Sequence, residues 1–452
     1  MNGMQKLIAA AAATALAAFA SQAQTPAPTW ELTQKSFEQV EKSGSVEFKD
    51  GVVKLDCVNS FSIPASVLGE QSDYTVEFEL KRGAGFKNLP RVEGALQIIS
   101  NLDLKEKAGF CLNYFPPEWD RNGGVSNRLG VSVNSYWNGE CAGLDGDAFN
   151  KFSFVVKSKA AAIYRNGLLQ MLTSDVSPSK ASIVVGGKGW RNAPGSYAGK
   201  AIPIAYELRN LKIYNAAISP SGYDKSGEMM RNCSGDAYSM QRANIKDASL
   251  PRILVIGDSI SMGYRGFITE HFKGKAYVDY WVGGKWFGDE WKGPDALAKR
   301  AWKGVLSNGP YDVISWNSMT LHMWNGYPGR CDEATYPQAM TEMLEYVQKS
   351  APESSLIWVR CTPWRTAPAS GRPTLDPVKN DRIVRLNEAA DKIMAAHNVP
   401  EVDLYSLCLK RMDTVKDGSQ DTVHWSGDVS REMAAEIIKE IEKSLEKKGK
   451  LK

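Results

Sequence analysis

The stretch "RILVIGDS", Arg252 to Ser259, decides how the second half of this chain is interpreted. Four consecutive apolar residues, 253–256, run directly into Gly257 and Asp258. A short apolar run that is rich in β-branched residues and ends at a turn signal predicts a buried strand. The segments "YDVISWN", 311–317, and "SSLIWVRCTP", 354–363, have the same character.

Helical patterns alternate with these strands. They cover residues 336–350, 380–398 and 430–448. Strands that alternate with helices predict a parallel sheet with helices on both faces. We therefore expect an α/β three-layer domain over residues 251–452.

The first half of the chain has a different pattern. Short segments with alternating or β-branched and aromatic residues predict antiparallel strands at 74–80, 151–156, 161–165, 182–187 and 208–214. Asn166-Gly167 lies directly after the third of them and suits the two left-handed positions of a tight hairpin. We expect an all-β sandwich over 24–219 and a connecting segment over 220–250, which has no clear period and several helix and strand breakers.

The N-terminal segment predicts export. Lys6 precedes an alanine-rich apolar run from Leu7 to Ala20, and "SQA", 21–23, provides small residues for a signal peptidase. The run is too short to span a bilayer. We expect residues 1–23 to be a bacterial-type signal peptide and the mature protein to be periplasmic or extracellular. A formal net charge of +4 does not predict binding to nucleic acid or to an anionic membrane.

The cysteines favour neither a metal site nor a particular disulfide pattern. The chain has seven, none of them in a CxxC pair, and an oxidising compartment permits disulfides. The odd number leaves one thiol without an intramolecular partner, and the spacing does not determine the pairs. We expect no metal and no organic cofactor, and the oligomeric state is open.

Ser259 and His424 are the residues best placed for acyl-transfer chemistry. In an open α/β sheet, functional groups gather beyond the carboxyl ends of the strands, and Ser259 follows such an end. The chain has only four histidines, and His424 lies in "DTVHWSGD", 421–428, directly before the last helical segment. Asp421, three residues earlier, is near enough to orient the imidazole.

A serine after the first strand and an Asp-x-x-His before the last helix resemble the SGNH, or GDSL-type, hydrolases over residues 252–448. The resemblance implies that Ser259 is the nucleophile, His424 the general base and acid, and Asp421 its orienting carboxylate. The segments "FSFVVKSKAAAIYRNGLL", "VVGG" and "ELRNLKIYNAAIS", within 152–219, look like the closing half of a laminin-G-like, concanavalin A-type jelly roll. That resemblance implies a jelly-roll topology for the sandwich, in which either glycan binding or a structural role is possible.

The same family resemblance implies an oxyanion hole with three donors. The first is the N–H of Ser259, and the second comes from a glycine after the second strand, for which we prefer Gly284 in "YVDYWVGGKWFGD", 277–289. The third is an asparagine in a Gly-x-Asn-Asp block, but this chain reads "ISWNSMTLHMW", 314–324. Either Asn317 or His322 then supplies the last donor, and the sequence leaves both open. Loss of one such donor typically slows turnover by about 100- to 1000-fold.

Aromatic residues favour a sugar or apolar acyl group as the substrate. Nine of the thirteen tryptophans lie in the second half of the chain. Candidate substrate contacts are Trp286, Trp324, Trp364, Arg365 and Trp425. Together with export and the lectin-like sandwich, they predict a secreted serine esterase that removes O-acetyl or other small acyl groups from a glycan. The alternatives are a lipase or arylesterase acting on non-sugar esters, and a glycan-binding protein with a disabled hydrolase domain.

Overall fold

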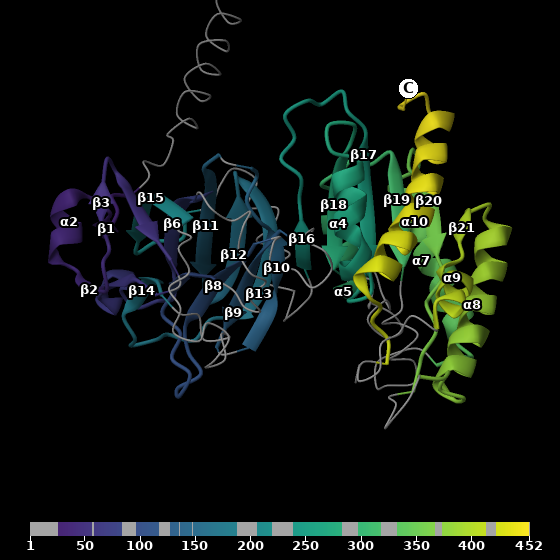
Figure 1. The fold of residues 1–452 in the computed structure, drawn as a ribbon, viewed down its shortest axis with the longest axis horizontal. Coiled ribbons are helices and arrows are strands. Elements are labelled where there is room, and N and C mark those ends of the chain that lie inside the picture. The colour runs from purple at the N-terminus through teal and green to yellow at the C-terminus, as the bar shows by residue number, and fades with distance from the viewer. Residues whose placement is uncertain are drawn as a thin grey trace, which may run out of the picture.

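The computed structural model describes residues 26–56, 58–83, 96–116, 127–134, 136–146, 148–187, 206–218, 238–282, 297–317, 332–366, 373–412 and 422–451 (Figure 1). The helices are α2 (Gln34–Gln39), η1 (Ala65–Leu68), α4 (Ser261–His271), α5 (Leu297–Leu306), α7 (Tyr336–Ser350), α8 (Lys379–Ala396), α9 (Leu404–Lys410) and α10 (Gly427–Lys447). The predicted signal peptide lies outside the described residues.

Strands dominate the first half of the chain and alternate with helices in the second. The first half contains β1 (Trp30–Glu31), β2 (Glu41–Ser43), β3 (Phe48–Lys49), β4 (Val52–Leu55), β5 (Ser60–Ile63), β6 (Tyr74–Arg82), β7 (Leu96–Ser100), β8 (Phe110–Phe115), β9 (Arg128–Val133), β10 (Tyr136–Ala142), β11 (Asn150–Lys157), β12 (Ala160–Arg165), β13 (Leu168–Asp175), β14 (Ile183–Gly186) and β15 (Tyr206–Tyr214). The second contains β16 (Tyr238–Gln241), β17 (Arg252–Gly257), β18 (Tyr277–Val282), β19 (Val313–Asn317), β20 (Ser355–Val359) and β21 (Glu401–Val402).

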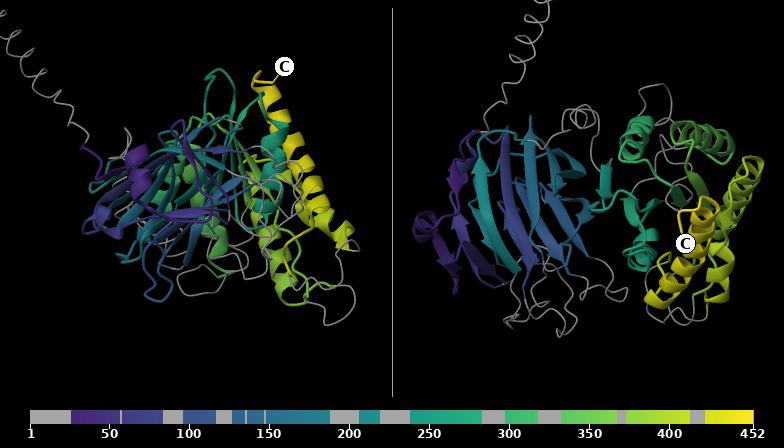
Figure 2. Two further views of the ribbon diagram at one scale, coloured as in Figure 1. Left: turned by 60° about the vertical axis from the view of Figure 1, so that its left-hand side comes forward. Right: turned by 90° about the horizontal axis from the view of Figure 1, so that it is seen from above.

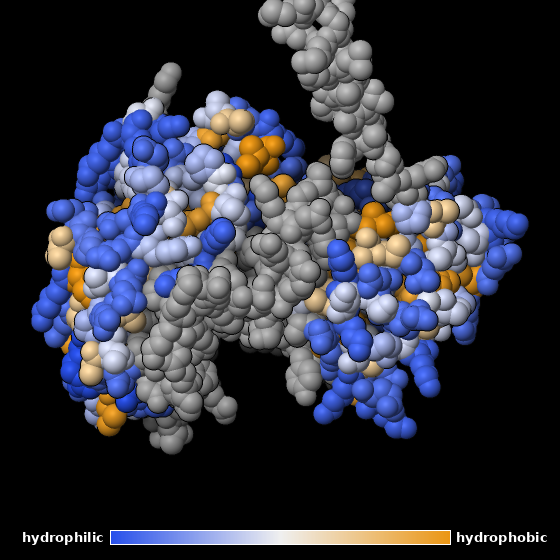
Figure 3. Space-filling model, turned by 180° about the vertical axis from the view of Figure 1, so that it is seen from behind, coloured by the Kyte–Doolittle hydropathy of each residue, from blue (hydrophilic) through white to orange (hydrophobic). Residues whose placement is uncertain are grey.

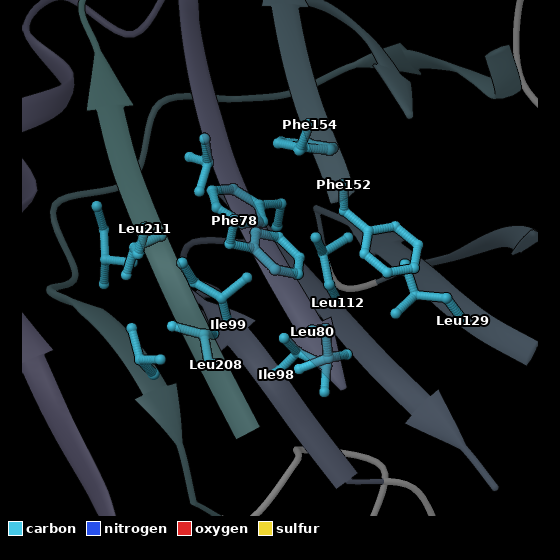
Figure 4. Packing of buried hydrophobic residues seen from close by; sticks show 14 of the residues in the cluster. Phe78, Leu80, Ile98, Ile99, Leu112, Leu129, Phe152, Phe154, Leu208 and Leu211 are labelled. Carbon is cyan, nitrogen blue, oxygen red and sulfur yellow. The ribbon is translucent and has the colours of Figure 1, made fainter. Parts of the chain in front are cut away.

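Two antiparallel sheets form the sandwich. One has the order β10-β9-β8-β7-β14-β5-β2, and the other contains β13-β12-β11-β6-β15-β4-β3. Their facing side chains make one apolar core, in which Phe78 of β6 stacks on Phe152 of β11 at 5.6 Å between ring centroids (Figure 4). Ile99 and Leu112 contribute to the same core from the opposite sheet. The alternation that the sequence shows is therefore the alternation between this core and the outer faces.

The predicted Asn-Gly hairpin is confirmed. Asn166 and Gly167 have φ values of 50° and 78°, and the residues on either side, Arg165 and Leu168, pair across β12 and β13. Both turn positions are left-handed, which asparagine tolerates and glycine adopts without a steric cost.

The second half forms a parallel sheet. Its order is β18-β17-β19-β20-β21, and every neighbouring pair is parallel. In chain order this is 2-1-3-4-5, so the direction of winding reverses between β17 and β19. Helices cover both faces: α5, α7 and much of α8 belong to one apolar cluster, and α4, α9 and α10 belong to the other. The predicted combination of antiparallel sheets with a later parallel sheet is confirmed.

Strand β16 joins the two halves into one sheet. It pairs antiparallel with β13 of the sandwich and antiparallel with β18 of the parallel sheet, which gives a continuous sheet of 14 strands (Figure 1). Val155, Ala162 and Leu172 of the sandwich also belong to the same apolar cluster as α5 and α7. The segment 220–250, which we expected to be a connection, thus contains a strand, and the right-hand view of Figure 2 shows the two halves side by side. The domain boundaries themselves stay predictions.

Four tryptophans form a buried ladder along one face of the parallel sheet. Trp281, Trp302, Trp316 and Trp358 contact one another in sequence, edge to face, with ring centroids 5.0, 5.6 and 5.1 Å apart. None is more than 5% exposed. These rings stabilise the core, because edge-to-face pairs add to the free energy of apolar burial. Since these four are buried, only other tryptophans are candidates for contact with substrate.

The described surface in Figure 3 is mainly hydrophilic. Apolar colour occurs there in small areas separated by polar residues, which is ordinary for a folded surface. Among the described residues, no helix combines the length and the apolar character needed to cross a membrane.

An acidic group at β21, Glu401, whose side chain is 30% exposed, predicts pH-dependent stability. Burial, together with a hydrogen bond to Asp391 and its charge, raises the pKa of Glu401 to about 7, although Arg360 opposes the shift. A glutamate in the unfolded chain has a pKa of about 4.3. Between this pKa and that of the folded state, the folded protein binds more protons than the unfolded chain, so its stability falls as the pH rises through this range. We expect the urea midpoint to fall from pH 5 to pH 8, and to fall less in Glu401→Gln. The exposed Glu270→Gln serves as the control. Equal pH dependence of wild type and Glu401→Gln would contradict the assignment.

Candidate active site

The turn that carries Ser259 requires glycine at its first position. Gly257 ends β17, and a Cβ atom added there would lie 2.4 Å from both Cβ and Oγ of Ser261. This distance is far inside van der Waals contact, so any side chain would push α4 away from the strand. The "GDS" sequence is therefore a tight strand-to-helix turn, as we expected from its place after the apolar run.

Three groups lie within hydrogen-bond distance of the main-chain carbonyl of Asp258, and two of them, the hydroxyls of Ser261 and Tyr280, also contact each other at 2.5 Å. Ser261 Oγ lies 2.6 Å from the carbonyl oxygen, Tyr280 Oη 3.1 Å and the Met262 nitrogen 3.2 Å. The Asp258 side chain, which is 7% exposed, accepts from the Ile260 N–H at 3.0 Å. The residues on both sides of Ser259 are thus fixed by hydrogen bonds.

Ser259 itself is exposed, although its neighbours Asp258 and Ile260 are buried. It lies between the end of β17 and the first residue of α4, next to the point at which the winding of the sheet reverses. Ligands of open α/β sheets bind at such a point, and a helix N-terminus favours negative charge. An exposed hydroxyl on a rigid turn at this place is suited to nucleophilic attack on a bound carbonyl.

Helix packing places the His424 segment beside this turn. Helices α4 and α10 are in contact, and a Cβ atom added at Gly263 would lie 2.7 Å from Ser430 Oγ. Gly263 is four residues beyond Ser259, and Ser430 is six residues beyond His424, so the first turns of the two helices touch. His424 is exposed and precedes α10, whose N-cap is Ser426. The structure thus brings together the surroundings of the two residues that the sequence pairs.

Arg365, which packs on Trp425, holds the main chain of the histidine segment. The Arg365 guanidinium donates to the main-chain carbonyl of His424 and lies 4.2 Å from the centroid of the Trp425 ring, while the Arg365 N–H donates to the Thr422 carbonyl at 2.9 Å. Arg365 is 1% exposed and Trp425 7%, so both offer little surface to a substrate. Their predicted substrate contact remains untested, and the described contacts favour a positioning role.

We expect Arg365→Met to lower kcat by roughly ten- to a hundredfold with little change in KM, because the histidine segment loses its main support. Arg365→Lys keeps the charge but not the planar group that stacks on Trp425, so it should recover only part of the activity. Steady-state kinetics on a small ester, with thermal unfolding as the check on folding, would measure this. An unchanged kcat in folded Arg365→Met would exclude the positioning role.

Asn317 is engaged within the sheet. It ends β19, is 1% exposed, and its Nδ2 donates to the carbonyls of Val359 and Arg360 at 2.9 and 3.4 Å. These two bonds tie the end of β19 to β20, and they use the amide hydrogens that an oxyanion would need. This geometry disfavours Asn317 as an oxyanion donor, and the alternative, His322, stays a prediction.

The remaining predicted site residues are distributed as follows. Trp364 is half-buried, and Lys379 Nζ lies 4.7 Å from the centroid of its ring. Asp421, Gly284, His322, Trp286 and Trp324 lie outside the described residues, so their roles stay predictions. Within the described ranges, no group of three or more His, Cys, Asp or Glu residues is arranged to hold a metal ion.

Buried contacts around Arg265 were not predicted from the sequence. Arg265 lies in α4, one turn beyond Ser261, and is 4% exposed. Its guanidinium forms an ion pair with Glu140 of the sandwich and lies over the ring of Tyr280. No local pattern signals this contact, because Glu140 and Arg265 are separated by 125 residues.

Comparisons with known proteins leave the family open. No protein-family model matches the chain, and no curated protein matches it. Solved structures that it resembles include the HCR/D W1238A mutant (16% identity, TM-score 0.29, 43% of this chain and 47% of that one). Others are the acetyl xylan esterase AlAXEase (16%, 0.32, 42% and 99%) and the native M. smegmatis aryl esterase (14%, 0.33, 43% and 100%). This chain thus spans about half of the first of these. Similarities at these TM-scores assign neither a family nor an activity to this chain.

Proposed function

We propose that this protein is an exported serine esterase that removes O-acetyl or other small acyl groups from a glycan. The main support is the contact between the first turns of α4 and α10, which lie just beyond an exposed serine and an exposed histidine. The strand order 2-1-3-4-5 supports the proposal further, because this is the flavodoxin-like order expected of an SGNH-type domain.

The proposed reaction is a two-step acyl transfer. Ser259 Oγ attacks the ester carbonyl while His424 takes its proton, and His424 then gives that proton to the departing sugar hydroxyl. Water, activated by His424, hydrolyses the acyl-enzyme and releases the acid. Asp421 orients the imidazole in this scheme, and the reaction requires neither a metal nor an organic cofactor.

Charge on the carbonyl oxygen would be stabilised by the N–H groups of Ser259 and Gly284 and by the ring N–H of His322. The Ser259 N–H makes no hydrogen bond with any described residue, which leaves it available as a donor. We choose His322 over Asn317 because the Asn317 amide already donates to two carbonyls. For the sugar we propose Trp286 and Trp324, since aromatic faces bind sugar rings.

The experiment that tests this function has two steps. Hydrolysis of p-nitrophenyl acetate by the purified protein tests the esterase activity, and acetate release from acetylated polysaccharides tests the substrate class. Deacetylation of a polysaccharide at a higher kcat/KM than that for the synthetic ester is the expected result. Binding of acetylated polysaccharide with no release of acid from any ester would instead show a glycan-binding protein.

A further inference from the structure

We infer that the sandwich positions the proposed nucleophile Ser259: Glu140 of β10 holds Arg265, Arg265 lies over the ring of Tyr280, and the Tyr280 hydroxyl contacts the main chain at Asp258. The inference rests on the proposed function for its kinetic consequence. It assigns the sandwich a part in the active site itself, beyond any binding of glycan.

The first link crosses between the two halves of the protein. Arg265 donates to a Glu140 carboxylate oxygen at 3.0 Å, and the two side chains are only 5% and 7% exposed. Arg128 also contacts this carboxylate at 3.1 Å. Burial leaves such a pair little screened by solvent, so removal of one partner leaves the other charge uncompensated. Glu140 therefore connects the sandwich to α4 through a buried ion pair.

The second link runs from Arg265 to Tyr280. The guanidinium carbon lies 4.3 Å from the centroid of the Tyr280 ring. Gln241 of β16, with its amide oxygen turned toward the guanidinium, accepts from it at 3.0 and 3.1 Å. The positive charge stabilises the ring by a cation–π contact. Burial raises the pKa of Tyr280 to about 12, so its hydroxyl stays protonated at neutral pH and remains a donor.

The third link reaches the nucleophile turn. The Tyr280 hydroxyl oxygen lies 3.1 Å from the Asp258 carbonyl oxygen and 2.5 Å from Ser261 Oγ, which is 2.6 Å from the same carbonyl, so the two hydroxyl protons are shared among these three oxygens. The Asp258 carbonyl and the Ser259 N–H belong to the same planar peptide group. Its orientation sets the direction of the Ser259 N–H, which the proposed mechanism uses as an oxyanion donor.

The network acts as one connected set of buried contacts, so a change at Glu140 should be felt at the turn. In Glu140→Gln we expect faster amide hydrogen exchange in peptides covering residues 253–264, with no change in peptides covering β20. We also expect kcat for p-nitrophenyl acetate to fall by about ten- to a hundredfold while KM stays within about twofold. Tyr280→Phe, which keeps the ring and loses the hydroxyl, should show the same pattern if Glu140→Gln folds poorly.

The matched control is Glu207→Gln. It breaks an ion pair of the sandwich, Glu207 with Lys81, whose charged atoms are 3.1 Å apart. This pair does not involve α4. Its exchange and kcat should equal those of wild type. Unchanged exchange at 253–264 in folded Glu140→Gln and Tyr280→Phe would overturn the inference, and so would faster exchange with an unchanged kcat. If wild type hydrolysed no ester, the proposed function would fail, and the exchange comparison alone would decide whether the sandwich holds the turn.

Discussion

Ser259→Ala is expected to lower kcat by at least about 10,000-fold while the protein stays folded. The nucleophile's role cannot be taken over by a neighbouring group, because Ser261 Oγ is buried and already donates to the Asp258 carbonyl at 2.6 Å. Ser259 is exposed, so the lost hydroxyl leaves no cavity and no unsatisfied buried partner. Initial rates on p-nitrophenyl acetate and on an acetylated glycan, with circular dichroism for folding, measure the effect.

The control for this variant is Ser249→Ala, in the exposed turn before β17. Ser249 is exposed and its hydroxyl hydrogen-bonds to the Asp247 side chain, so its loss should leave kcat unchanged. A Ser259→Ala protein with more than about a tenth of the wild-type rate would rule out Ser259 as the nucleophile.

The second large effect is expected for His424→Ala. Removal of the base should lower kcat by at least about 1000-fold, because the serine hydroxyl is a weak nucleophile without a proton acceptor. The side chain is exposed, and its main chain is held by Arg365 through the carbonyl, so the segment should keep its conformation. Added imidazole should restore part of the rate in a concentration-dependent way.

His397→Ala is the matched control. That histidine follows α8, contacts Gln348 at 3.2 Å and comes shortly before β21. It therefore lies toward the edge of the sheet at which the parallel strands begin, whereas Ser259 follows the carboxyl end of β17. The variant should hydrolyse esters at the wild-type rate. Full activity in folded His424→Ala would show that another base serves Ser259 or that the reaction takes a different course.

The local patterns predicted the strands and helices well. The apolar runs at Ile253 and Ile314 became central parallel strands, and Asn166-Gly167 forms the expected tight hairpin turn. These features depend on neighbouring residues alone. Strand β16 has only four residues and gains its stability from β13 and β18, so nothing in its own sequence distinguishes it from a loop.

For the candidate site, only the positions of residues can be compared with the sequence, and their roles stay predictions. The place of Ser259 directly after a buried strand was predictable from the apolar run that precedes it. The roles of buried polar residues were not predictable, because Asn317 and Arg365 find their partners in segments distant in the chain. An arginine near a predicted site suggests contact with substrate, whereas in the structure Arg365 lies beneath Trp425 and holds the His424 segment. The Glu140–Arg265 pair could not be predicted either, because its two residues are also far apart in the chain.

Covalent trapping with a fluorophosphonate shows whether Ser259 is a nucleophile that His424 activates. We expect one adduct per chain, located on Ser259 by mass spectrometry of the peptide after proteolysis. The adduct should be absent in Ser259→Ala and should form at least about 100-fold more slowly in His424→Ala. An unlabelled Ser259 in folded wild-type protein that hydrolyses esters, or equal labelling rates in wild type and His424→Ala, would show that these two residues do not act together.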